Sequence, residues 1–188
     1  MNTSENERYR ETENRIMAAF MELLSEKEPA KISVKELCER SGIHRSSFYL
    51  HFQDIFDLMD STERHLAEEY GNIFAADRSG FEAGYSLNDR FLELFRYIYE
   101  HRRFYQVYWF RAKGLKVLDT ALNENDLVRM LQTAARHGFS NEVILEYHQL
   151  YFRSGIAALI GYWLSRDCKE TPEELLQILI DEYRGRTH

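Results

Sequence analysis

Hydrogen-bonding side chains of several kinds gather between residues 33 and 52 of this 188-residue sequence. They are Ser33, His44, Arg45, Ser46, Ser47, Tyr49 and His51. Arginine can bond bidentately to a guanine edge, and serine can bond to either partner of a base pair. Tyrosine and a helix-capping serine are better suited to phosphate oxygens. The chemistry that this group could perform is therefore binding to double-stranded DNA.

Two short helices would have to position these side chains. Ser33 and Glu36 form a Ser-x-x-Glu capping box that predicts the start of the first helix. Gly42 would end it, and a second helix is expected over about 44–50. Residues that can pack the corner between the two helices are Leu37, Ile43 and Phe48. The pattern predicts a helix-turn-helix. Periodicity alone leaves an ordinary helical hairpin with a solvated polar face equally open.

Helical periodicity continues along the rest of the chain. Further helices are expected over about 7–26, 54–76, 87–98, 104–110, 127–135, 140–166 and 172–183. Residues 77–85 are the clearest linker, and no strand pattern or internal repeat is present. The expected fold is all-α with about nine helices. We expect a DNA-binding domain over 1–53, followed over 54–188 by a connecting helix and a larger helical domain for dimerisation and ligand binding.

Composition narrows the function classes. The formal net charge is −7, and residues 1–52 hold 8 Lys/Arg against 9 Asp/Glu. DNA binding would therefore depend on a few suitably placed side chains and not on a broad positive surface. No apolar run reaches bilayer length and no signal peptide opens the chain, which predicts a cytoplasmic protein without membrane contact. Two cysteines give no disulfide framework, and no catalytic or metal-binding spacing is found. We therefore expect neither an enzyme nor a cofactor or metal site.

Three short motifs in this region carry a family resemblance: Ser33-Val34-Lys35, Ser41-Gly42-Ile43 and Phe48-Tyr49-Leu50-His51-Phe52. They resemble the helix-turn-helix of the tetracycline-repressor (TetR/AcrR) family, over about residues 10–70. The resemblance adds Lys35 as a basic DNA-contacting position. It also implies a homodimer bound to a palindromic operator, usually as a repressor that a ligand releases. Residues 102–110 and 155–179 resemble the C-terminal domain of some Firmicutes members of the family.

The sequence departs from the family pattern just after the second helix. Many members carry a lysine where this chain has Ile55, and Gln53 is also uncharged. Two contacts to the DNA backbone would then be missing. An alternative is therefore a co-activator, or a protein-interaction module of the same fold with weak DNA binding.

The segment 155–164 contains no charged residue and is apolar around its full circumference. We expect this helix and the last helix to form a four-helix bundle with a second copy of the chain. The expected interface residues are Gly155, Ala158, Leu159, Tyr162, Trp163, Leu175 and Leu179. The alternative is that 155–164 is the central helix of a monomeric core.

Aromatic residues could also line a pocket for a small apolar or aromatic ligand. The candidates are Phe95, Tyr99, Tyr105, Trp109, Tyr147 and Tyr151. Aromatic residues at helical spacing are more often core residues than ligand contacts. The core interpretation is therefore favoured over the pocket.

Overall fold

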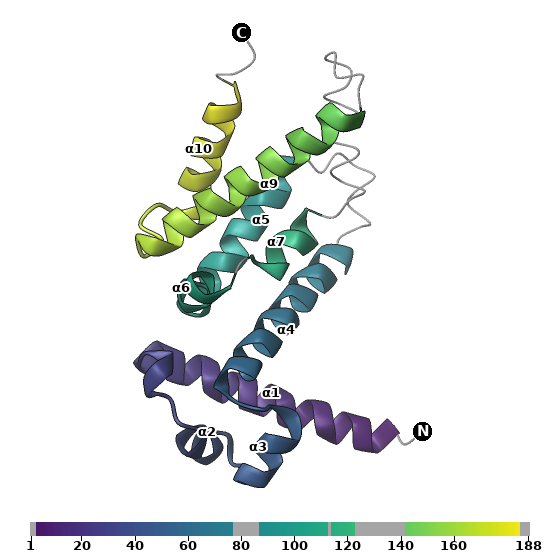
Figure 1. Ribbon diagram of the computed structural model, residues 1–188, viewed down its shortest axis with the longest axis vertical. Coiled ribbons are helices and arrows are strands. Elements are labelled where there is room, and N and C mark those ends of the chain that lie inside the picture. The colour runs from purple at the N-terminus through teal and green to yellow at the C-terminus, as the bar shows by residue number, and fades with distance from the viewer. Residues whose placement is uncertain (1–2, 77–86, 113, 123–141, 185–188) are drawn as a thin grey trace. The chain divides into compact units, whose positions relative to one another are not determined.

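In this computed structural model the described residues are 3–76, 87–112, 114–122 and 142–184 (Figure 1). Within these ranges the structure contains nine α-helices, one short 3-10 helix and no strand, which confirms the all-α fold. The linker expected at 77–85 and the helix expected at 127–135 lie outside the described residues. The chain divides into two compact units, Met1–Arg64 and His65–His188, and the boundary falls inside helix α4 (Ile55–Ala76).

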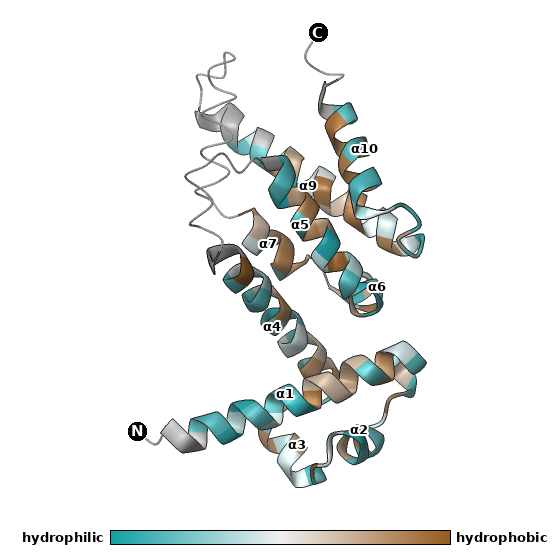
Figure 2. Cartoon of the chain, turned by 180° about the vertical axis from the view of Figure 1, so that it is seen from behind, coloured by the Kyte–Doolittle hydropathy of each residue, from teal (hydrophilic) through white to brown (hydrophobic). Residues whose placement is uncertain are grey.

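The first unit is built on helix α1 (Thr3–Glu26), which packs against α2 (Val34–Ser41), which in turn packs against α3 (Arg45–His51). A 3-10 turn (Pro29–Lys31) joins α1 to α2. The fully buried side chains of this unit include Ile16, Phe20, Leu23, Leu37 and Phe48. In α1 they follow the i, i+4, i+7 spacing of one helix face. Figure 2 shows that the hydrophobic part of α1 is its C-terminal half.

Side-chain caps set the helix starts that the sequence predicts. Ser33 Oγ accepts a hydrogen bond from the backbone N–H of Glu36 at 3.2 Å, as expected for a capping serine. The Glu36 carboxylate pairs with Lys27, so only one half of the predicted capping box forms. At α10 the box is complete: Thr171 Oγ1 accepts from Glu174 N (3.2 Å), and Glu174 Oε2 accepts from Thr171 N (2.8 Å).

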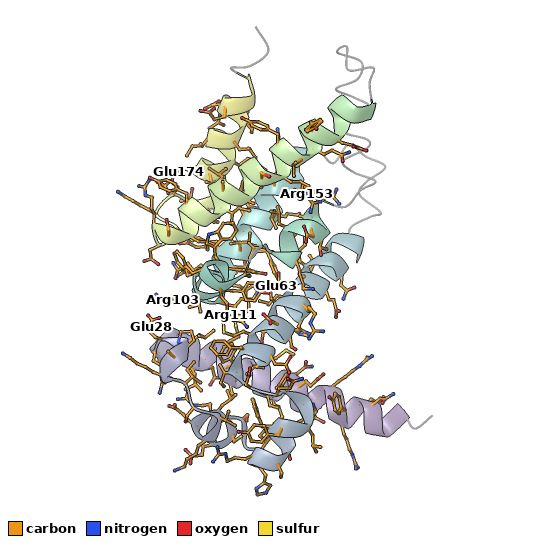
Figure 3. All side chains as sticks on the ribbon, viewed as in Figure 1. Glu28, Glu63, Arg103, Arg111, Arg153 and Glu174 are labelled. Carbon is orange, nitrogen blue, oxygen red and sulfur yellow. The ribbon has the colours of Figure 1, made fainter. Side chains whose placement is uncertain are left out.

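The second unit is organised around α5 (Leu87–Glu100), which packs against α6 (Arg102–Arg111), α7 (Lys116–Ala121) and α10 (Pro172–Arg184). Helix α9 (Glu142–Ser165) packs against α6. An ion pair also joins α9 to α7, between Arg153 and Asp119 (Figure 3). The core is strongly aromatic and includes Phe91, Phe95, Phe104, Tyr105 and Trp163.

Helix α7 was not predicted from the sequence. It is only six residues long, so it spans less than two turns and shows no clear helical period. Its role is to close the core, because Val117, Leu118 and Ala121 are all buried.

The side chain of Trp109 on α6 packs closely over Gly161 of α9. A Cβ atom placed there would lie 2.2 Å from the Trp109 indole. Next to it, Trp163 is 1% exposed and donates from Nε1 to the carbonyl of Glu170 at 2.9 Å. The end of α9 is therefore anchored inside its own unit. Among the described helices, none is long and apolar enough to cross a membrane.

Candidate nucleic-acid interface

Helix α3 presents one face to the core and the opposite face to solvent. Phe48 is fully buried, whereas Arg45, Ser46 and Tyr49 are exposed. His44 is the N-cap residue of α3 and is also exposed, while Ser47 is half-buried. These side chains occupy the outer face and flanks of the second helix of a helix-turn-helix, which is the helix that enters the major groove in proteins of this kind.

Hydrogen bonds from Arg15 of α1 hold the turn that precedes α3. Gly42 has φ 67° and ψ 38°, a left-handed conformation that favours glycine. Arg15 Nη2 donates to the carbonyl of Ser41 at 2.6 Å and to that of Gly42 at 3.1 Å. Arg15 thus satisfies carbonyl groups at the end of α2, where helical partners run out. The sequence pattern did not single out Arg15, because it lies 26 residues before Ser41.

The two sites expected on α2 are both accessible. Ser33 is exposed at the helix start, and the Lys35 side chain is 73% exposed, with its Nζ 3.8 Å from Glu39. Arg40 is differently placed, because its guanidinium donates to both carboxylate oxygens of Glu26 (2.8 and 3.1 Å). These hydrogen bonds hold the pKa of Glu26 below its usual value. Lys35 therefore carries the more available positive charge of α2.

His51 does not lie with the other candidates. Its side chain is 6% exposed, and its Nδ1 lies 3.6 Å from the Glu13 carboxylate of α1. The ring of Tyr9 also packs on it. The expected set of DNA-contacting residues is therefore brought together without His51, which faces α1.

The start of α4 carries carboxylates close to where the resemblance expected a lysine. Asp54 Oδ1 accepts from the backbone N–H groups of Phe56 (2.7 Å) and Asp57 (2.9 Å). Asp57 in turn accepts from the N–H of Gln53 at 2.9 Å. Helix N-termini often bind phosphate through such N–H groups. Here these N–H groups already donate to the carboxylates of Asp54 and Asp57.

Cys38 lies under the helix-turn-helix corner and is 4% exposed. Burial raises the pKa of its thiol, while the nearby Arg45 opposes that shift. A buried thiol with a raised pKa is a poor nucleophile. Its structural role is that of a small hydrophobic residue.

The six expected ligand-pocket residues do not form one pocket. Phe95 and Tyr105 are fully buried core residues, Tyr99 stacks on Trp163, and Trp109 covers Gly161. Tyr147 and Tyr151 of α9 are 70% and 59% exposed. Phe95 and Tyr105 thus have the placement of core residues, whereas Tyr99 and Trp109 are half-buried.

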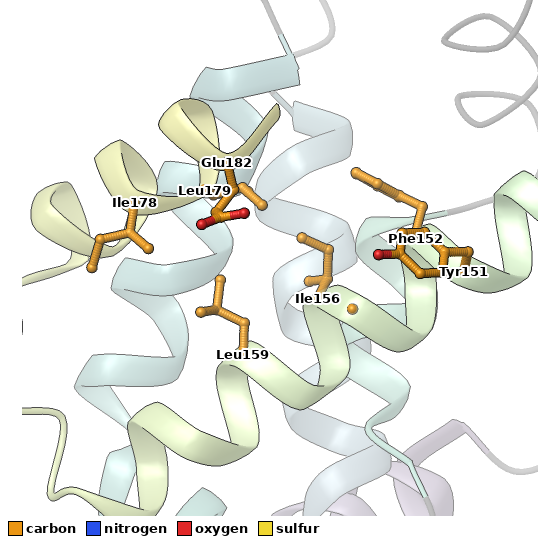
Figure 4. Close-up of a pocket in the computed structure, with 8 residues that line it drawn as sticks. Tyr151, Phe152, Ile156, Leu159, Ile178, Leu179 and Glu182 are labelled. Carbon is orange, nitrogen blue, oxygen red and sulfur yellow. The ribbon is translucent and has the colours of Figure 1, made fainter. Parts of the chain in front are cut away.

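A groove of about 210 Å³ lies instead between α9 and α10 (Figure 4). Its lining consists of Tyr151, Phe152, Gly155, Ile156, Leu159, Ile178, Leu179 and Glu182. Tyr151 comes from the expected ligand pocket, whereas Gly155, Leu159 and Leu179 come from the expected dimer interface. The sequence did not indicate this groove, since it depends on how residues 19 or more positions apart on two helices pack together.

The expected dimer-interface residues divide into two groups. Trp163, Leu175 and Leu179 are buried within their own unit. Gly155, Ala158 and Tyr162 are exposed, and Leu159 is half-buried. Without a rearrangement of the core, a second copy of the chain could contact only the exposed Gly155, Ala158 and Tyr162 and the half-buried Leu159.

Comparisons with known proteins match both parts of the chain. A family model described as "Transcriptional regulator C-terminal region" matches residues 86–182, and one described as "Bacterial regulatory proteins, tetR family" matches residues 16–62. A Bacillus subtilis relative, the uncharacterized HTH-type transcriptional regulator YxbF, is 22% identical over 173 residues. That alignment covers 88% of this chain but only 43% of the relative.

Three solved structures share the fold. The dihydroxyacetone kinase operon activator DhaS superposes with a TM-score of 0.68 at 20% identity, covering 93% of this chain and 95% of that one. The fatty acid degradation regulator FadR from Bacillus halodurans gives 0.65 at 14% identity, covering 94% and 96%. FadR from Bacillus subtilis in complex with stearoyl-CoA gives 0.59 at 16% identity, covering 88% and 96%.

Proposed function

The chain belongs to the tetR family of bacterial regulatory proteins, and on that basis we propose that it binds a palindromic operator as a homodimer. It is a transcriptional regulator of this family. In the proposal, residues 1–53 bind DNA, and residues 54–188 supply the connecting helix and the dimerisation and ligand-binding domain.

The observation that carries the DNA-binding proposal is the outer face of α3. Ser46 is exposed on it opposite the fully buried Phe48, and Arg45 and Tyr49 are exposed on its flanks. None of the hydrogen bonds or ion pairs among the described residues uses the Arg45 guanidinium, unlike those of Arg15 and Arg40. A guanidinium that is free on an exposed helix face can bond bidentately to guanine O6 and N7.

In vitro selection from a random duplex pool tests this assignment. We expect the full-length protein to enrich one duplex family, and Arg45→Ala and Tyr49→Phe to bind it more weakly while keeping their helical content. Arg96→Ala on α5 is the control, because it removes an exposed arginine of the second unit, one that pairs with Glu173. Unchanged binding by both α3 variants would contradict the site assignment.

Exposed apolar side chains on α9 and α10 support the homodimer. Tyr151, Tyr162 and Ile178 are 59%, 63% and 44% exposed, and Tyr151 and Ile178 line the groove between the two helices. Apolar surface shared by two helices is the kind that two-fold dimers bury. We expect Ala158→Arg to sediment as a monomer. The control is Ala18→Arg, at an exposed position on α1, and a monomeric wild type would contradict the proposal.

We also propose that an apolar ligand releases the protein from its operator, which makes it a repressor. The groove between α9 and α10 is apolar except for Glu182 and the Tyr151 hydroxyl, and one structural neighbour is described in complex with stearoyl-CoA. Stearoyl-CoA is therefore the first probe, with free coenzyme A as control. Release of the selected duplex by the first and not the second supports the proposal, whereas release by neither contradicts it for acyl ligands.

A protein-interaction module with weak DNA binding is the second candidate. The acidic start of α4 favours it, since Asp54 and Asp57 place negative charge where a phosphate would otherwise bind. If this candidate is correct, the selection will enrich no duplex. Substituting Asp54→Ser, which keeps a capping oxygen without the charge, would then increase non-specific DNA binding.

A further inference from the structure

The most exposed large hydrophobic side chain of the chain's described residues lies on α3. Leu50 is 77% exposed and stands two positions after the fully buried Phe48. Successive residues of an α-helix are rotated by about 100°, so a residue two positions away lies on nearly the opposite face. Ser46, two positions before Phe48, lies on the same outer face. Ser46 and Leu50 are thus an i, i+4 pair at the centre of the solvent side of α3.

An isolated exposed leucine is common and by itself needs no explanation. Here its neighbours define the environment. Arg45 and Tyr49 flank the same face and are also exposed. An isobutyl group can neither donate nor accept a hydrogen bond, so on a helix face that is proposed to read bases it can contribute only an apolar contact.

The major groove offers one apolar group at its base edges, the C5-methyl group of thymine. We propose that Leu50 contacts a thymine methyl group of the operator and so determines specificity at that base pair. This inference rests on the proposed DNA-binding function and names one feature of the operator. Ser46 and Leu50 are separated by four residues, or about 6 Å along the helix.

That separation places the thymine on the DNA. For a recognition helix that lies along the major groove, 6 Å spans about two base-pair steps of about 3.4 Å, so we expect the thymine about two base pairs from the position that Ser46 contacts.

Thymine-to-uracil substitution tests the contact, because it removes the methyl group and leaves base pairing unchanged. Each thymine of the selected duplex is replaced in turn, and the affinity of the full-length protein is measured. We expect one position in each half-site to lose about fourfold in affinity, the effect of one buried methyl-sized group. For Leu50→Ala, the parent duplex should bind more weakly, and the same uracil substitution should have no effect.

Two control variants separate this contact from general weakening. Leu50→Met keeps an apolar side chain and should keep the sensitivity to uracil. Arg45→Ala should weaken binding and yet retain the fourfold loss on uracil substitution. Urea unfolding of Leu50→Ala checks that the exposed substitution leaves the fold intact.

The outcomes distinguish the inference from the proposed function. If the protein enriches a duplex but tolerates uracil at every thymine, the proposed function stands and the inference is overturned. Equal sensitivity of wild type and Leu50→Ala also overturns it. If no duplex is enriched, the proposed function fails and the inference fails with it.

Discussion

The imidazole ring of His51 packs against the phenol ring of Tyr9, with the ring centroids 4.0 Å apart and the ring planes inclined by 37°. This contact joins the last turn of α3 to the N-terminal half of α1. The carboxylate of Glu13, also on α1, lies 3.6 Å from His51 Nδ1. His51, which the sequence predicted as a DNA-contacting residue, is thus placed to position α3 against α1.

The first prediction follows from that placement. Substituting His51→Ala should lower the free energy of unfolding by about 1 kcal/mol, because an aromatic contact is lost. The slope of log K for the selected duplex against log salt concentration should stay unchanged, since no phosphate contact is removed.

Lys35→Ala is the matched comparison for this salt dependence. Lys35 is exposed at the start of α2, and loss of one phosphate contact in each protomer should reduce the slope for the dimer by about two. A reduction of the same size for His51→Ala would show that its imidazole reaches the DNA backbone after all.

The second prediction concerns the turn between α2 and α3. Gly42→Ala should destabilise the first unit by about 1 to 2 kcal/mol, because an alanine is strained at φ 67°. The new Cβ would also lie 2.9 Å from Arg15 Nη2. Gly114→Ala is the control, since its Cβ meets no atom within 4 Å. Urea unfolding measures both, and equal stability of the two variants would contradict the role of the turn.

The third prediction concerns the close approach of α6 to α9. Gly161→Ala should cost about 1 to 3 kcal/mol, because its Cβ would overlap the Trp109 indole. In the double variant Gly161→Ala/Trp109→Ala the overlap is absent. The two substitutions should therefore be clearly non-additive in thermal or urea unfolding. Additive effects would mean that Trp109 does not cover Gly161.

The fourth prediction is a pH dependence. Burial lowers the pKa of His101 below its usual value, and the nearby Glu69 and Glu100 only partly oppose this shift. The unfolded chain therefore binds the proton more readily, so the free energy of unfolding should fall as the pH drops below about 6.5. His101→Gln should show a shallower fall between pH 7 and 5.5. Identical curves for the two proteins would exclude His101 as the cause.

Local patterns in the sequence were enough to predict most of the fold. The Ser33 cap, the Gly42 turn and the Thr171–Glu174 box each depend on residues within four positions, and the structure contains all three. The inward-facing Phe48 followed from helical spacing. Elements of this kind are set by neighbours along the chain.

Features that depend on distant contacts were not predictable. The Arg15 bonds to the end of α2, the inward position of His51 and the groove between α9 and α10 all involve segments far apart in sequence. Helix α7 is stabilised by burial in the core and is too short to show a period. Phe95 and Tyr105 of the expected aromatic pocket lie in the core and Trp109 covers Gly161; ligand binding by the aromatic residues stays a prediction.

The central claim is that two copies of this chain place their α3 helices on one operator. Hydroxyl-radical footprinting of the full-length protein on the selected duplex tests it most directly. We predict two protected half-sites related as an inverted repeat, with centres about one helical turn apart, and loss of both on Arg45→Ala. A single protected patch without two-fold symmetry, or the same footprint with Arg45→Ala, would contradict the account.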